Sequence, residues 1–231
     1  MSNYIVTGTN RGIGLEFVSR LLSQGHQVIA TARNPEAVPA LQDLLSRYGS
    51  QLSLLPLDLA DENSLNSFAS RIGDQPVDVL INNAGVYGPR DAVLGNLRGK
   101  DWAETLWIDI IAPMLLTQSL LPALRRGTDK RIAFLSSKMG SIDDNTSGGS
   151  YVYRSAKTGL NQAVKSLSID LRDEGFVVLP LHPGWVKTDM GGPGALIDTN
   201  TSVSGLLNLI QYCGIADSGK FFAYDGKQIA W

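Results

Sequence analysis

A tyrosine and a lysine in the stretch SYVYRSAK (150–157) are spaced so that they could transfer a proton. Residues four apart share one face of a helix, so Tyr153 and Lys157 would point the same way. The lysine ammonium stabilises a phenolate and lowers the pKa of a phenol, which is ordinarily about 10. Tyr151 lies on another face, with Ser155 as its neighbour four residues on. We expect Tyr153 to be the proton-transferring group; the alternative is a helix start with a phenol and an amine on its surface.

A glycine-rich segment, TGTNRGIG (7–14), separates the first apolar run from the first helical pattern. Gly8, Gly12 and Gly14 let the backbone turn tightly and come close to a pyrophosphate. The start of the following helix offers free N–H groups and a favourable dipole. The spacing is G-x-x-x-G-x-G, and its place after a strand and before a helix favours a dinucleotide site over an ordinary turn.

The end of the second apolar run indicates which dinucleotide binds. An NAD site usually has an Asp or Glu there for the ribose 2′-hydroxyl, whereas an Arg accommodates a 2′-phosphate. This chain has Ala32 followed by Arg33, and Arg11 adds a second positive charge in the glycine segment. We therefore expect NADP(H); the alternative is that Arg33 is a solvated charge. Asp58 could accept from the adenine amino group or cap a loop.

Short apolar runs alternate with helical patterns along the whole chain. This alternation predicts one α/β domain, a doubly wound Rossmann-type parallel sheet of about seven strands with helices on both faces. We expect Pro35 to begin a helix and Pro113 to kink a long one. The expected strands are 4–8, 27–33, 52–59, 77–85, 131–137, 176–184 and 220–226; the longest expected helices are 101–126 and 151–174.

The composition argues against several kinds of partner. A formal net charge of −2 offers no basic surface to nucleic acid and no polybasic membrane segment. We expect no signal peptide, and no stretch apolar enough to span a membrane. The single cysteine, Cys213, indicates a reducing compartment, so we expect a cytoplasmic protein. His26 and His182 stand apart from other metal-binding residue types, so we expect no metal site.

The chain resembles the classical short-chain dehydrogenase/reductase family over its full length. The resemblance rests on TGTNRGIG, Asp58, NNAG (82–85), the serine pair 136–137, YRSAK (153–157) and HPGWVKTDM (182–190). Within that family the C-terminal third is similar to the sniffer-like and C-factor-like carbonyl reductases. Such proteins are expected to carry one Rossmann-type domain and a nicotinamide cofactor.

The resemblance also implies roles for individual residues. Ser137 aligns with the catalytic serine, Tyr153 with the acid/base and Lys157 with its partner. Asp109 stands where the family usually has an Asn that holds a water of the proton relay, which puts this relay in doubt. If Asp109 approaches Lys157, its carboxylate would keep the pKa of Tyr153 higher than an Asn would; the alternative is that Asp109 is protonated or points away. A substrate loop is expected at about 189–201 and would be mobile. The implied cofactor-binding residues are Gly8, Asn10, Arg11, Gly12, Ile13, Gly14, Arg33, Asp58, Leu59, Asn82, Ala84, Gly85, Tyr153, Lys157, Pro183, Gly184, Val186 and Thr188.

Two classes of function remain open. The first is an NADPH-dependent reductase that converts an aldehyde, ketone or quinone to an alcohol, with a small apolar carbonyl as substrate. The second is a dinucleotide-binding sensor or signalling protein of C-factor type with little turnover. A reductase of carrier-bound acyl chains would share the fold, but no basic docking patch supports it. The two long helices resemble the pair that builds dimers in the family, so a homodimer or homotetramer is possible.

Overall fold

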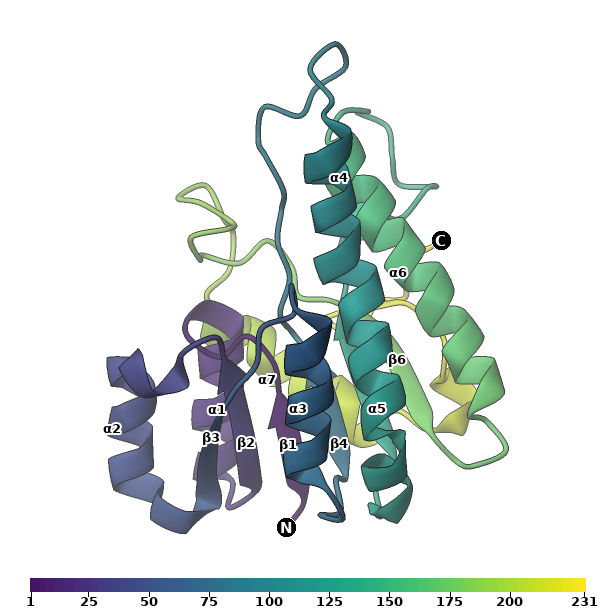
Figure 1. The fold of residues 1–231 in the computed structure, drawn as a ribbon. Coiled ribbons are helices and arrows are strands. Elements are labelled where there is room, and N and C mark those ends of the chain that lie inside the picture. Colours follow the sequence, from purple (N-terminus) through teal and green to yellow (C-terminus); the bar gives the residue numbers. More distant parts are fainter.

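The structure, a computed structural model, describes all 231 residues and contains one parallel sheet. Its seven strands follow the order β3-β2-β1-β4-β5-β6-β7, which confirms the expected doubly wound arrangement (Figure 1). The change of direction between β1 and β4 is the place where such sheets bind ligands. The strands are β1 (Asn3–Val6), β2 (Gln27–Ala32), β3 (Leu52–Pro56), β4 (Val79–Asn82), β5 (Arg131–Leu135), β6 (Val177–His182) and β7 (Phe222–Ala223).

Helices cover both faces of this sheet. One layer contains α1 (Gly12–Ser23), α2 (Pro39–Tyr48) and α7 (Thr199–Tyr212), and the other contains α3 (Glu62–Ile72), α5 (Ala112–Arg126) and α6 (Tyr151–Asp170). Successive strand residues alternate between the layers, so Tyr4 and Val6 enter one core and Ile5 enters the other. Burial on both faces explains why the strands read as continuous apolar runs.

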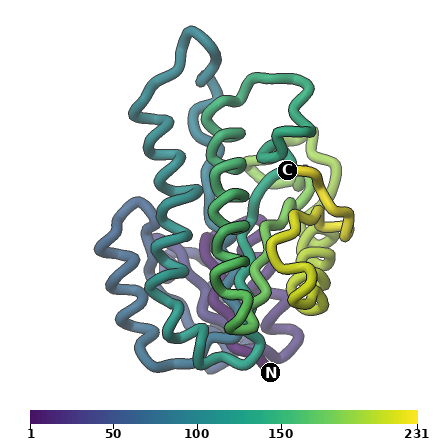
Figure 2. Tube along the Cα trace, turned by 90° about the vertical axis from the view of Figure 1, so that its right-hand side faces the viewer, coloured from purple at the N-terminus to yellow at the C-terminus, as the bar shows by residue number.

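The long helical run is interrupted where it passes the carboxyl edge of the sheet. It consists of α4 (Gly99–Leu106), a π-helical turn (Trp107–Ile111) and α5, and Figures 1 and 2 show it running beside α6. Pro113 cannot donate a hydrogen bond to the carbonyl of Asp109, and its ring would collide with that carbonyl in a regular helix. The wider turn relieves this conflict, so the sequence correctly located an irregularity near Pro113 but not its π-helical form.

This run also corrects one expectation about membranes. By length and composition alone, Gly99–Arg126 could cross a membrane, so the expectation that no stretch qualifies is wrong on that criterion. In the folded chain, Leu116, Leu120 and Leu124 of the run are buried in the core layer shared with α3 and α6. The core helix of a globular fold meets the same criterion.

Two predicted boundaries differ from the structure. Pro35 begins a short 3-10 turn that ends at Ala37, and α2 begins only at Pro39, because Val38 between them is extended. The expected substrate loop ends earlier than predicted, since Thr199 to Thr201 already belong to α7. The Asp198 carboxylate caps this helix by accepting from the backbone N–H of Thr201 at 2.7 Å.

Candidate active site

A cleft of about 830 Å³ lies along the carboxyl edge of the sheet at the point between β1 and β4. The loops after β1, β2, β3, β4 and β6 line it, together with two residues of α6. Its volume and position are those of a typical cofactor site. The structure places the following predicted residues in its wall: Gly8, Asn10, Arg11, Gly12, Ile13, Gly14, Arg33, Asp58, Leu59, Ala84, Gly85, Tyr153, Lys157, Pro183 and Thr188.

The glycine segment is packed so tightly that side chains would not fit. A Cβ at Gly14 would clash with the carbonyl of Gly8 and lie 2.6 Å from Asn83 Nδ2. Gly8 has φ +69°, and a Cβ there would lie 2.8 Å from Ala84 Cα. The segment is therefore pressed against the loop after β4. This leaves the first N–H groups of α1 at the cleft, where they could bind a pyrophosphate.

Three predicted cofactor residues do not line the cleft. Asn82 Nδ2 donates to Thr117 Oγ1 at 3.2 Å within the core, because Asn82 still belongs to β4 and points toward α5. Gly184 and Val186 also lie outside the wall: Gly184 packs under Ile197, and Val186 is only 4% exposed. None of these three residues is part of the cleft wall, and their assignment to cofactor binding stays a prediction.

Asn83, and not the predicted Asn82, lies in the wall of the cleft. Its side-chain Nδ2 donates to the carbonyl oxygens of Thr7 at 2.7 Å and Gly8 at 3.1 Å, and its backbone N–H donates to Thr7 Oγ1 at 3.0 Å. Asn83 therefore holds the glycine segment against β4 and also lines the cleft. The second Asn of NNAG was the only feature of the sequence that could have indicated Asn83. The orientation of the backbone at the end of β4 determines which of the two asparagines faces the cleft. Lys187, a further cation in the wall, was also missed.

The two predicted phosphate-reading arginines are in different states. Arg33 is exposed at the end of β2, lines the cleft and forms no ion pair, so its guanidinium is free to meet an anion. Arg11 instead pairs with Asp189 across the mouth of the cleft, and both side chains are largely exposed. Asp58 lines the cleft and also accepts from the backbone N–H of Ala60 at 3.0 Å, so both roles considered for it are compatible.

The residues expected to do chemistry meet at the end of this cleft. Tyr153 and Lys157 lie one turn apart on α6, with Lys157 Nζ 5.6 Å from the centroid of the Tyr153 ring. Ser137, just after β5, lies within hydrogen-bonding reach of the Tyr153 phenol. Tyr153 is 9% exposed and Tyr151 is 38% exposed, as the helical spacing predicts for one inward and one outward tyrosine.

Lys157 forms an ion pair with Asp109, the residue whose role the sequence left open. Asp109 Oδ2 lies 3.0 Å from Lys157 Nζ, and both side chains are almost completely buried. Asp109 Oδ1 accepts from the backbone N–H of Val86 at 2.8 Å, and Lys157 Nζ also donates to the carbonyl of Leu135 at 3.2 Å. A Cβ at Gly85 would lie 3.1 Å from Oδ1 and 3.2 Å from Nζ, so the pair packs tightly against this glycine. The carboxylate therefore points toward the lysine.

Several groups shift the pKa of Tyr153 in opposite directions. Burial raises this pKa, and the Lys157 charge lowers it, as expected, but by less; Asp109 raises it further and the hydrogen bond with Ser137 lowers it. The net result is a raised pKa, because the lowering by the Lys157 ammonium does not outweigh the effect of burial. For Lys157, burial is the largest single influence and lowers the pKa. The charges of Asp109 and Tyr153 and the hydrogen bond with Asp109 together outweigh burial, so the pKa is raised and the ammonium is kept.

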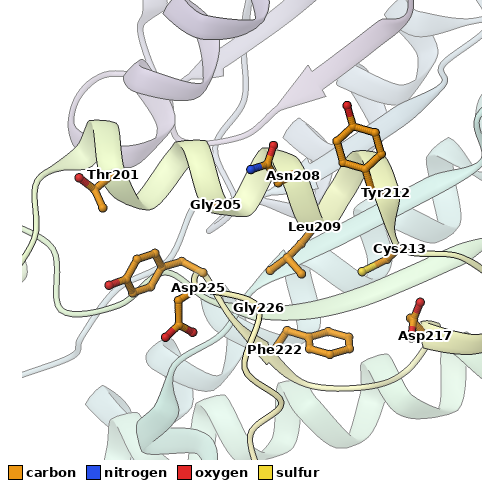
Figure 3. A pocket seen from close by; sticks show the side chains of 11 residues that line it. Thr201, Gly205, Asn208, Leu209, Tyr212, Cys213, Asp217, Phe222, Asp225 and Gly226 are labelled. Carbon is orange, nitrogen blue, oxygen red and sulfur yellow. The ribbon is translucent and has the colours of Figure 1, made fainter.

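A second hollow of about 580 Å³ lies between α7 and the C-terminal strand β7 (Figure 3). It contains Leu209, Cys213 and Phe222 but none of the serine, tyrosine and lysine of the first site. Burial raises the pKa of the Cys213 thiol, so little reactive thiolate forms there. No group of three His, Cys, Asp or Glu side chains in the structure is placed to hold a metal ion. The chemistry of the chain is therefore concentrated in the first cleft.

The chain as a whole is similar to known proteins in sequence and in fold. The C-signal protein of Myxococcus xanthus is 48% identical to this chain over 167 residues, which cover 72% of this chain and 100% of that protein. The structure of the carbonyl reductase Sniffer of D. melanogaster superimposes with a TM-score of 0.94 at 36% identity and covers 100% of both chains.

An NADPH-bound carbonyl reductase from chicken fatty liver superimposes with a TM-score of 0.92 at 35% identity, over 100% of this chain and 99% of that one. A family model described as short chain dehydrogenase matches residues 2–194. This range contains the glycine segment, Asp109, Ser137, Tyr153 and Lys157. The chain therefore belongs to the short-chain dehydrogenase/reductase family of oxidoreductases.

Proposed function

We propose that the protein is an NADPH-dependent reductase that converts the carbonyl group of an aldehyde, ketone or quinone to an alcohol. The observation that carries this proposal is a dinucleotide-sized cleft with Tyr153 and Lys157 in its wall, backed by Ser137 near the phenol and by the buried Lys157–Asp109 pair. The structural neighbours described as carbonyl reductases support the substrate class. The cofactor preference is supported by the free Arg33 at the end of β2 and by the NADPH-bound neighbour.

The cleft fits the proposed cofactor on the chain's own geometry. The glycine segment leaves no room for side chains beside the start of α1, and Arg33 lies at the end of β2 where a 2′-phosphate would be recognised. The bound cofactor would supply the hydride to the carbonyl carbon. Thr188 and Pro183 would border its nicotinamide end, next to Tyr153.

The protein's own residues would supply the proton and stabilise charge. Tyr153 donates its phenolic proton to the carbonyl oxygen, while the Ser137 hydroxyl donates a hydrogen bond to the same oxygen. The carbonyl thus gains a hydride on carbon and a proton on oxygen, which yields the alcohol. The Lys157 ammonium stabilises the phenolate that remains. Solvent then returns a proton to Tyr153 before the next turnover.

The raised pKa of Tyr153 favours reduction over oxidation. Reduction needs the protonated phenol, and a pKa raised by burial favours that protonated form at neutral pH. Oxidation of an alcohol needs the phenolate, which this environment disfavours. We therefore infer that activity in the reducing direction extends through neutral pH and falls at alkaline pH.

A dinucleotide-binding signalling protein with little turnover is the second candidate. The 48% identity to a protein named C-signal favours it. The Ser137, Tyr153 and Lys157 geometry favours the enzyme, because a protein that only binds a dinucleotide does not need an acid next to a buried ammonium. The reductase should turn over NADPH with a carbonyl substrate, whereas the signalling protein should bind NADPH with little turnover.

The test is oxidation of NADPH in the presence of a panel of aromatic aldehydes, aliphatic ketones and quinones. The reductase should turn over at least one of these classes. Tyr153→Phe should abolish this turnover and retain NADPH affinity, because only the proton is lost. Tyr151→Phe, on the outward face of the same helix, should retain most of the rate. Equal rates for the two variants would remove Tyr153 from the mechanism, and NADPH binding without turnover across the panel would favour the signalling candidate.

A further inference from the structure

One face of the Tyr153 ring is covered by an aromatic side chain from another part of the chain. Tyr87, in the loop that follows β4, stacks on Tyr153 with ring centroids 4.6 Å apart and planes at 27°. The loop and α6 are far apart in sequence, so this contact exists only in the folded chain. Stacked aromatic pairs of this geometry attract each other beyond the effect of the area that they bury.

Tyr87 is itself anchored to the residue that precedes the catalytic helix. Its hydroxyl lies 2.9 Å from Ser150 Oγ. Ser150 has φ +47°, a left-handed conformation that residues with a side chain rarely adopt, and its hydroxyl caps no N–H of α6. A serine before a helix usually caps it from an extended conformation. Here the hydroxyl bonds to Tyr87 instead, so this tyrosine is fixed to the start of α6 as well as to Tyr153.

The backbone beside Tyr87 leaves little freedom to move. Gly88 has φ +73°, and a Cβ at this position would lie 2.8 Å from Thr105 Oγ1 and 3.2 Å from Val152 Cγ1. The loop is therefore pressed between α4 and α6. Because both helices hold this backbone, the Tyr87 ring has a defined place relative to Tyr153.

Arg90 adds a contact on the solvent side. Its guanidinium carbon lies 5.3 Å from the centroid of the Tyr87 ring, and its Nη2 donates to the carbonyl of Met190 at 3.0 Å. Met190 belongs to the segment after β6 that lines the cleft. Arg90 thus connects the wall of the cleft to the stacked pair of tyrosines.

We propose that Tyr87 is a positioning residue that holds the Tyr153 phenol at the angle and hydration needed for proton transfer. This inference rests on the proposed role of Tyr153 as the acid. Tyr87 acts through the ring of Tyr153 and need not touch the reacting carbonyl. Two consequences follow from its contacts: the orientation of the phenol depends on the stack, and water is kept from one face of that ring.

Loss of the Tyr87 ring should change both properties. A displacement of about 1 Å at a catalytic group can lower a rate by about a hundredfold. Water admitted beside the Tyr153 ring would solvate its phenolate and lower its pKa. The other groups that face this phenol are Lys157 on the same helix, Asp109 in the π-helical turn and Ser137 after β5, and all three are retained.

The experiment compares Tyr87→Leu, Tyr87→Phe and the control Tyr151→Leu. Tyr87→Leu should lower kcat roughly ten- to a hundredfold, with little change in KM for the carbonyl or in NADPH affinity. Its alkaline limb should move to lower pH, because activity falls as Tyr153 loses its proton. Tyr87→Phe keeps the ring and should restore most of the rate. Tyr151→Leu removes an equal ring from the exposed face of α6 and should leave the rate and the pH profile unchanged.

A readout without substrate separates this inference from the proposed function. The ultraviolet difference spectrum of tyrosinate, taken between wild type and Tyr153→Phe, gives the titration of Tyr153, and Tyr87→Leu should shift that titration to lower pH. If Tyr153→Phe remains active, the proposed function fails. If Tyr153→Phe is inactive but Tyr87→Leu keeps the wild-type kcat and titration, or changes KM alone, the positioning role is wrong. Ser150→Ala removes the same hydrogen bond as Tyr87→Phe and should match it. If Tyr87→Leu does not fold, Tyr87→Met removes the ring in its place, and a wild-type kcat and Tyr153 titration in that variant would overturn the positioning role.

Discussion

Replacing Asp109 by Asn tests the electrostatics of the site most directly. The change removes one negative charge and preserves the shape of the side chain. In the structure Oδ2 lies 3.0 Å from Lys157 Nζ, which in turn lies 5.6 Å from the Tyr153 ring centroid. Oδ2 is therefore no farther from that centroid than these two distances together. Asp109 raises the pKa of Tyr153 from this position, after burial and against the Lys157 charge.

The size of the effect follows from Coulomb's law. At the greatest separation that these distances allow, and at an effective dielectric constant of about 20, two unit charges interact by about 2 kcal/mol. One pKa unit corresponds to about 1.4 kcal/mol. Asp109→Asn should therefore lower the pKa of Tyr153 by about one unit. Reduction requires the protonated phenol, so the alkaline limb of kcat should move to lower pH by the same amount.

The assay is kcat against pH with saturating NADPH and a fixed carbonyl substrate. Asp101→Asn is the matched control: it removes the same charge from the same helical run, but Asp101 pairs with Arg98 on the surface of α4. The control should leave the alkaline limb in place. An Asp109→Asn limb that stays in place or moves upward would refute the electrostatic reasoning. An upward movement would mean that Lys157, without its partner, loses its own charge through burial.

Three further changes test other parts of the structure. Arg33→Ala should weaken NADPH binding by about 1–3 kcal/mol and leave NADH binding nearly unchanged, and equal losses in a fluorescence titration would contradict a role in reading the 2′-phosphate. Gly14→Ala should lower NADPH affinity and cost roughly 1–3 kcal/mol of stability, because its Cβ would collide with Asn83. The control Gly99→Ala has open space around it and should change neither the affinity nor the stability. An unchanged NADPH titration and Tm for Gly14→Ala would contradict the tight packing at Gly14. Burial, aided by the Lys138 charge, lowers the pKa of His182 to about 4. This histidine is protonated earlier in the unfolded chain, so the free energy of unfolding should fall by roughly 3 kcal/mol as pH drops from about 6.5 to 4, and His182→Asn should flatten this slope in urea titrations; an unchanged slope would contradict it.

Local geometry explains what could be predicted from the sequence. The strands are short apolar runs because both faces of a parallel sheet are covered, and all seven were located to within a few residues. The spacing of Tyr153 and Lys157 placed them on one helical face, since that relation depends only on the turn of the helix. Gly8 and Gly14 indicated the tight turn at the cleft, because the close approach of the backbone excludes a side chain at these positions.

Other features depend on which segments, far apart in the chain, lie side by side in the fold. The sequence does not show which segments these are. Asn82 and Asn83 are adjacent and identical in type, yet the pleat of β4 turns one into the core and the other toward the glycine segment. Pro113 indicated an irregular turn, but only the folded chain shows that Asp109 lies 3.0 Å from Lys157.

The raised pKa of Tyr153 has the same origin. The sequence showed the lysine that lowers this pKa because it lies on the same helix. The sequence also raised the hypothesis that Asp109 opposes the lysine, but left open whether its carboxylate approaches Lys157. It did not show the burial of Tyr153, which comes from other elements of the fold. Burial and the effects of distant charges depend on all the neighbours of a group in space. The sequence by itself therefore determined which groups are present and spaced for chemistry. Only the tertiary structure decided the direction in which their pKa values shift.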